Sequence, residues 1–152
     1  VANFARTPRG GDTDQIKSVA SGECGVALTN TYYLVRLMRS AKPEDRDIVA
    51  RIGVVTPNQS SWGTHVNVSG AAVARNAPHP DTARQFLEYL ASDEAQTYLA
   101  DGNNEWPVVA SVKVRNEALE SLGKFRTDTL PIGSIGRSQI TAAKIIDRAG
   151  WK

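Results

Sequence analysis

The feature that most constrains the fold is an apolar run, Cys24 to Leu28, which passes through three polar residues into a helix-forming pattern. Beyond the polar residues, Leu34, Leu37 and Met38 recur at helical spacing and therefore share one helix face. The pattern predicts a strand, a tight connection and a helix. In α/β folds this order places the connection at the carboxyl edge of a strand, where such folds bind their ligands.

The rest of the chain alternates in the same way. Further strands are predicted within residues 48–55, 66–73 and 108–110. Further helices are predicted to start at Asp12 or Thr13, after Pro80, at Ser92, at Asn116 and at Ser138, with loops at 57–63 and 133–136. Strands that alternate with helices predict the α/β fold class.

Composition excludes several classes of protein. The chain has 152 residues, the length of one ordinary domain. Its formal net charge of +2 is too small to indicate a nucleic-acid partner. No window is apolar enough for a transmembrane helix, so no direct membrane insertion is expected. The single cysteine, Cys24, leaves no internal disulfide, and the start at Val1 without a methionine suggests a processed or partial chain.

Two adjacent tyrosines, Tyr32 and Tyr33, fall at the start of the first predicted helix. Neighbouring side chains inside a helix diverge by about 100°, but at a helix start both phenols can turn toward one point. Phenolate oxygen is a hard ligand that suits ferric iron, and a bound cation can remove the phenolic proton at neutral pH. The alternative is that both rings are half-buried packing residues.

No catalytic constellation is present, and we therefore expect no enzyme. The sequence lacks the nucleophile elbow, the phosphate-binding loop and the zinc-protease motif. The two histidines, His65 and His79, stand far apart with no cysteine or carboxylate at ligand spacing, so they do not predict a zinc site.

The segment from Gly11 to Leu34, which contains both tyrosines, closely resembles the periplasmic ferric-ion-binding proteins. These are the solute receptors of bacterial iron ABC importers. The resemblance continues in chain order through residues 63–70, 83–90, 92–96 and 104–108. It covers nearly the whole chain.

This resemblance implies an α/β fold of the type II periplasmic-binding-protein kind, a two-lobed Venus flytrap. The chain resembles the second, carboxyl-terminal half of such a receptor. By that correspondence residues 1–62 belong to the carboxyl-terminal lobe, 63–113 return to the amino-terminal lobe, and 114–152 form the tail of the carboxyl-terminal lobe.

The resemblance also implies a function and a site. Tyr32 and Tyr33 match the two consecutive tyrosines that ligate Fe(III) in the family, and Asn30 matches an asparagine that contacts a synergistic anion, carbonate or phosphate. The alternative for Asn30 is a helix cap, a role that asparagine fills well. The implied protein is a periplasmic receptor that captures ferric iron between its lobes and delivers it to an ABC transporter permease. The missing amino-terminal half would supply the other iron ligands.

Two alternatives stay open. One is a receptor of the same fold for another solute, such as a phosphonate, a polyamine or a sulfate-like anion. The other is an enzyme on this architecture. The tandem tyrosines favour iron, because an anion site needs backbone donors and basic groups rather than two phenols that must each ionise.

Overall fold

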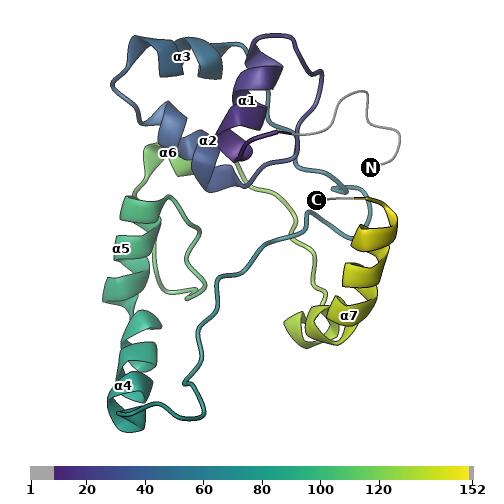
Figure 1. Cartoon of the computed structure of the whole chain (residues 1–152). Helices are drawn as coiled ribbons and strands as arrows, with labels where there is room; N and C mark the ends of the chain where they lie inside the picture. Colours follow the sequence, from purple (N-terminus) through teal and green to yellow (C-terminus); the bar gives the residue numbers. More distant parts are fainter. Residues whose placement is uncertain (1–8, 151–152) are drawn as a thin grey trace. The chain divides into compact units, whose positions relative to one another are not determined.

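The computed structural model describes residues 9–150 (Figure 1). These residues divide into two units by packing. The larger unit comprises Gly10–Val55 and Asn67–Lys124, and the smaller unit comprises the other described residues. The predicted lobe boundaries after residues 62 and 113 refer to the two-lobed receptor and stay a prediction, and residues 1–8 of the first predicted segment lie outside the described chain. None of the helices in residues 9–150 combines the length and apolar character needed to cross a membrane.

The core of the larger unit lies where three short helices meet. They are α1 (Asp12–Ala20), α2 (Thr31–Met38) and α3 (Pro43–Ala50). The buried core residues are Ile16, Leu34 and Leu37, against which Tyr33, Met38, Ile48, Val49, Ile52 and Leu122 pack. The predicted apolar face of the helix that contains both tyrosines is therefore confirmed, and α2 packs into the core through this face.

The predicted helices that follow Pro80 and Ser92 are confirmed as α4 (Pro80–Leu90) and α5 (Asp93–Asn103). Pro80 stands in the first turn of α4, where its fixed φ and missing N–H cost nothing. The Ser92 hydroxyl accepts a hydrogen bond from the backbone N–H of Ala95 at 3.2 Å, which is the predicted cap. The helix α5 ends at Asn103, because Asn104 takes the left-handed conformation (φ 62°) that closes it.

The apolar runs predicted as strands form no β-ladder within residues 9–150, and this part of the prediction is wrong for the described chain. In the run before α2, Val26 and Leu28 are each 89% exposed. A strand is stable only when a neighbouring strand accepts its backbone hydrogen bonds, and none lies beside this run. Periodicity therefore identified apolar segments but not the partners that they require.

The apolar run 48–55 illustrates a second cause of error. Its first three residues lie in α3, not in a strand. Pro43 opens this helix, and Glu44 and Asp45 in its first turn interact favourably with the helix dipole. These start signals lie before the apolar run, so they determined the structure of its first residues.

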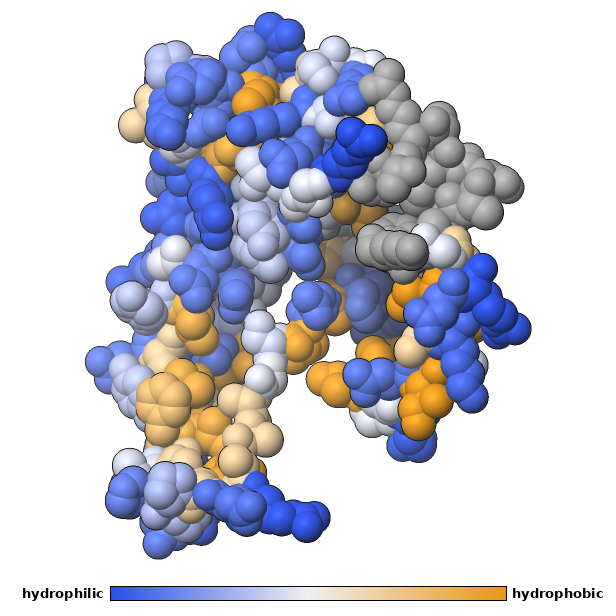
Figure 2. All heavy atoms as spheres, viewed as in Figure 1, coloured by the Kyte–Doolittle hydropathy of each residue, from blue (hydrophilic) through white to orange (hydrophobic). Residues whose placement is uncertain are grey.

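The last helix, α7 (Ile132–Arg148), begins six residues before the predicted start at Ser138 and includes the predicted loop 133–136. Pro131 precedes it with an extended conformation, and the Pro131 carbonyl accepts a hydrogen bond from the N–H of Ser134 at 2.8 Å. Because each residue added to an existing helix gains a hydrogen bond, the glycines at 133 and 136 weaken the first turns without interrupting them. Hydrophobic side chains are exposed on this helix (Figure 2), among them Ile132, Ile140 and Ile145.

The predicted loop 57–63 is confirmed as a series of turns in the smaller unit. It ends at a parallel bridge between Thr64 and Thr127, in which the Thr64 N–H donates to the Arg126 carbonyl at 2.8 Å. Gly63 has a φ of 98°, and a Cβ atom there would lie 2.6 Å from the Thr127 carbonyl carbon. Only glycine fits this close approach between two backbones.

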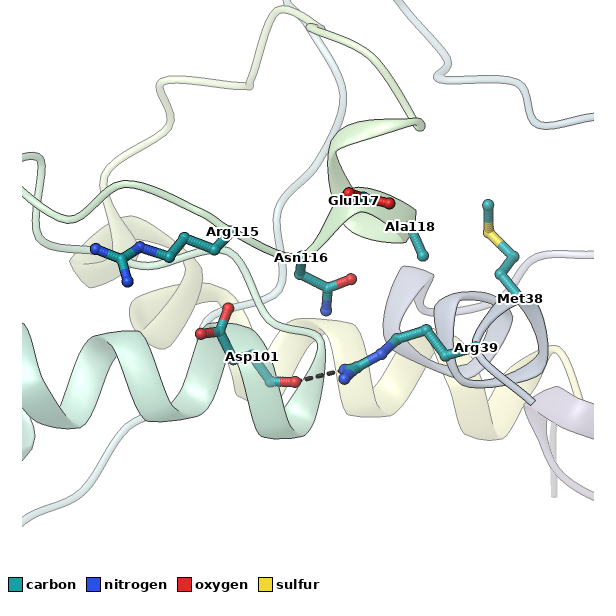
Figure 3. Close-up of a pocket in the computed structure, with 7 residues that line it drawn as sticks. All are labelled: Met38, Arg39, Asp101, Arg115, Asn116, Glu117 and Ala118. Atoms are coloured by element: carbon teal, nitrogen blue, oxygen red, sulfur yellow. Dashed lines mark hydrogen bonds between the residues drawn. The ribbon is translucent and has the colours of Figure 1, made fainter. Parts of the chain in front are cut away.

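A network of partly buried hydrogen bonds connects the ends of α2 and α5 with the short helix α6 (Glu117–Glu120). The Asn116 amide donates to the Ala100 carbonyl at 3.1 Å and to the Asn104 side-chain oxygen at 2.9 Å, and it caps α6 by accepting from the N–H of Leu119. The Arg39 guanidinium donates to the Asp101 carbonyl and, at 2.6 Å, to Asn104 Oδ1. Of these residues, Arg39, Asp101 and Asn116 line a pocket of about 510 Å³ (Figure 3).

We expect Asn116→Ala to lower the free energy of unfolding of the natural protein by about 1–3 kcal/mol. Asn116 is only 6% exposed, so its removal leaves buried carbonyl and N–H groups without partners. Urea denaturation measures the change. Ser121→Ala is the matched control, because the Ser121 hydroxyl bonds to Ala118 at the surface and its loss should cost less than about 0.5 kcal/mol. Equal effects of the two substitutions would contradict a buried structural role for Asn116.

Candidate metal centre

The two tyrosines occupy the first turn of α2, as predicted. Asn30 is the N-cap residue of this helix, so Tyr32 and Tyr33 are its second and third residues. Their ring centroids lie 4.5 Å apart and the ring planes meet at 39°. Both side chains are partly buried. The start of the helix therefore holds two phenols side by side instead of spreading them around the helix.

Tyr33 also contributes to packing, which was the alternative interpretation of the pair. Its ring packs against the core of Ile16, Leu34 and Leu37. The guanidinium carbon of Arg36 lies 5.3 Å from the ring centroid, a cation–π contact from the next turn of the helix. These contacts fix the orientation of Tyr33, and a fixed ring is compatible with a ligand whose oxygen is held in place.

The electrostatic surroundings of Tyr32 favour a cation. Its pKa is raised above the ordinary value of 10.0, first by its hydrogen bond with Tyr33, then by partial removal from water and by repulsion from Tyr33, Asp12 and Glu105. In the metal-free protein Tyr32 is therefore a neutral phenol. The same negative charges that hold its proton would attract a metal ion to the phenolic oxygen.

Asp12 and Glu105 are members of this site that the sequence did not reveal. Asp12 was predicted only as a possible helix start, and it is the first residue of α1, which follows the N-cap residue Gly11. Glu105 follows α5, in a different segment of the chain. No local pattern connects either residue with Tyr32, because the folded chain, not sequence spacing, brings them near it.

Asn30 lies at the N-cap position of α2, but its side chain makes no capping hydrogen bond. Its backbone N–H donates to Asp12 Oδ2 at 2.7 Å and its side-chain amide donates to the same oxygen at 3.0 Å. Its Oδ1 accepts from the Asn67 amide at 3.4 Å. The side-chain cap, which was the alternative for Asn30, is therefore wrong, and its predicted contact with a synergistic anion stays a prediction.

The candidate metal centre consists of the hard phenol oxygens of Tyr32 and Tyr33, and their role as ligands stays a prediction. Within residues 9–150 no three His, Cys, Asp or Glu side chains form a group that could hold a metal ion. The single cysteine, Cys24, is free and partly buried. Two phenols in negative surroundings fit a small, highly charged cation that prefers oxygen, and ferric iron is such a cation.

Comparisons with known proteins identify the family of the chain and several relatives. The family described as bacterial extracellular solute-binding protein matches residues 3–128. Iron uptake protein A2 of Synechocystis sp. is 46% identical over 154 residues, which is 100% of this chain and 44% of that protein. The major ferric iron-binding protein of Neisseria meningitidis serogroup B is 28% identical over 137 residues, or 90% of this chain and 40% of that protein. The chain thus spans less than half the length of these relatives.

Solved structures give the same result for the fold. The Trichodesmium protein IdiA (FutA), in complex with iron and citrate ligands, matches with a TM-score of 0.88 and 49% identity over 99% of this chain and 47% of its own. A ferric binding protein from Campylobacter jejuni matches with a TM-score of 0.91 and 36% identity over the same shares of the two chains. These matches confirm the predicted resemblance to ferric-ion-binding proteins and the predicted periplasmic-binding-protein-like fold, of which the chain covers about half.

Proposed function

The chain belongs to the bacterial extracellular solute-binding proteins, and from that premise we propose that the natural protein is a periplasmic receptor for ferric iron. It captures the ion between two lobes through the phenolates of Tyr32 and Tyr33 and delivers it to the permease of an ABC importer. The observation that carries this proposal is the pair of phenol rings, 4.5 Å apart, in the first turn of α2. The iron-related names of the similar proteins support it.

The chain's own residues contribute three things to iron capture. The first turn of α2 provides two oxygen donors on one rigid element, and its dipole favours the negative charge that each phenol acquires on binding. Asp12 and Glu105 add negative charge near Tyr32. Since Tyr32 is neutral before binding, the phenolic proton leaves when the metal arrives.

Two phenolates do not complete the coordination of a ferric ion. The remaining ligands would come from the rest of the receptor when its lobes close around the ion, and from an anion. Carbonate and phosphate are the anions that the resemblance implies, with Asn30 as their contact. The iron complex of the Trichodesmium protein contains citrate, so an organic anion is a further candidate for this position.

The charges around Tyr32 argue against the alternative of an anion receptor. An oxyanion bound without a metal requires basic groups or free backbone donors. Instead, Asp12 and Glu105 are the charged side chains that raise the Tyr32 pKa, and Asp12 already holds two donors of Asn30. These acidic groups would repel a phosphonate or sulfate-like solute and would attract ferric iron. An enzymatic role has no support from the residues of the site.

A visible absorption band tests the proposal. We expect the natural protein to turn orange or red when ferric iron is added, because phenolate-to-iron charge transfer absorbs visible light. Gallium(III) is the matched control, since it has the same charge and similar ligand preferences but gives no such band. Bound ferric iron without a visible band would show that the ligands are not phenolates.

A further inference from the structure

One oxygen of the Asp12 carboxylate lies at the amino end of α2, the helix that carries both tyrosines. Asp12 Oδ2 accepts the backbone N–H of Asn30 at 2.7 Å and the side-chain amide of Asn30 at 3.0 Å. Both contacts are partly buried and join residues 18 positions apart. The carboxylate of α1 is thereby fixed against the N-cap residue of α2.

This position is one where a negative charge is stabilised. Asp12 is the first residue of α1, and Asn30 directly precedes the first residue of α2. The amino ends of both helices therefore act on the same carboxylate through their dipoles. Backbone and side-chain N–H groups before a helix are also the donors that proteins use to hold a free oxyanion. Asp12 takes the place that such an oxyanion would need.

We propose that the Asp12 carboxylate is the built-in anion of this iron site, so that iron is held without carbonate or phosphate at Asn30. The inference rests on the proposed iron-binding function and replaces the predicted anion contact of Asn30 with a contact inside the chain. A free oxyanion arriving at Asn30 would find its backbone N–H already bonded and would be repelled by Asp12. Asp12 acts as a positioning residue, because its carboxylate accepts both hydrogen bonds from Asn30.

The test uses Asp12→Asn in the natural protein. Asparagine has the same shape and keeps an oxygen acceptor for Asn30, but it removes the negative charge and adds an N–H donor. Asp14→Asn is the matched control. Asp14 lies in the same turn of α1, and its carboxylate accepts a hydrogen bond from the N–H of Gly11 at 3.0 Å. Asp14→Asn therefore removes the same charge near the same helix end, but it leaves the contact between Asp12 and Asn30 unchanged.

Two measurements are made on the three proteins. Calorimetry follows the binding of inorganic phosphate to the metal-free proteins. Competition with the chelator nitrilotriacetate gives the ferric iron affinity with and without added bicarbonate or phosphate at constant ionic strength. The phosphate titration contains no iron, so it tests Asp12 separately from the proposed function.

We expect the unmodified protein and Asp14→Asn to bind no phosphate and to keep their iron affinity when either oxyanion is added. Asp12→Asn should bind phosphate, and its iron affinity should rise about tenfold or more with added oxyanion. A similar rise in the unmodified protein would overturn the inference, whether or not the variant folds. So would an Asp12→Asn protein that stays insensitive to both anions. An unmodified protein that binds no iron would instead refute the proposed function.

Discussion

Replacing either tyrosine by phenylalanine will weaken ferric iron binding by orders of magnitude while the natural protein stays folded. Tyr32→Phe and Tyr33→Phe each remove one oxygen and keep the ring that packs at the start of α2. The loss of one ligand bond to a trivalent ion costs several kcal/mol, and about 1.4 kcal/mol corresponds to a factor of ten in affinity. The double substitution should abolish both the visible band and iron binding.

The same substitutions will have a small effect on stability. Each removes the hydrogen bond between the two hydroxyl groups, whose surroundings are open to water, so its loss changes the free energy of unfolding little. Spectra, iron titrations and urea denaturation of the single variants separate the two roles. Tyr98→Phe is the matched control, because Tyr98 is 73% exposed on α5 and its hydroxyl has no part in the proposed site. Unchanged iron binding together with reduced stability in both variants would mean that the tyrosines are packing residues.

Iron affinity will fall steeply as the pH is lowered. Tyr32 is a neutral phenol in the metal-free protein, since its pKa is raised above 10.0 by the hydrogen bond with Tyr33 and by nearby negative charges. Binding as phenolate releases its proton, so this residue alone lowers the affinity about tenfold for each unit of decrease in pH. Between about pH 8 and about pH 6 we expect a loss of at least about a hundredfold.

The loss of iron affinity at low pH is not explained by a lower stability of the fold that results from titration of Tyr32. A raised pKa means that the fold favours the neutral phenol, so the contribution of Tyr32 to stability is fully present below its unfolded pKa. This contribution disappears only as the pH rises through the folded pKa, far above the range of the experiment. Acidification therefore releases iron by competition with protons at this residue, not by loss of structure.

Chelator competition at several pH values, corrected for protonation of the chelator, measures the dependence. Tyr32→Phe supplies the control, because without the phenolic proton the slope should become shallower by about one proton. An affinity that stays constant between neutral and mildly acidic buffer would indicate ligands other than tyrosine.

Several features of the structure were predictable because they depend on residues within one or two helical turns. The spacing of Leu34 and Leu37 predicted the buried face of α2, and the hydroxyl of Ser92 predicted the start of α5. The placement of both tyrosines in the first turn of α2 followed from the polar residues before them. In each case the interacting groups are close in sequence, so their geometry is determined locally.

Features that join distant segments were decided by tertiary structure. The apolar run before α2 has the pattern of a strand, but pairing needs a partner that no local signal supplies, and Val26 and Leu28 are exposed instead. The early start of α7 shows that helix propagation can outweigh two glycines that suggested a loop. Asn116 reads as a simple cap, yet its amide also joins α5 through Ala100 and Asn104.

The candidate site divides in the same way. The sequence by itself determined that two phenols share the start of one helix, because adjacency and the first turn are local properties. It did not determine the charges that surround them. Asp12 reaches Asn30 only after α1 packs against α2. Glu105 follows α5 and acts on Tyr32 only in the folded chain. Coulomb interactions depend on distance in space and not on distance along the chain, so the electrostatics of the site belong to the tertiary structure.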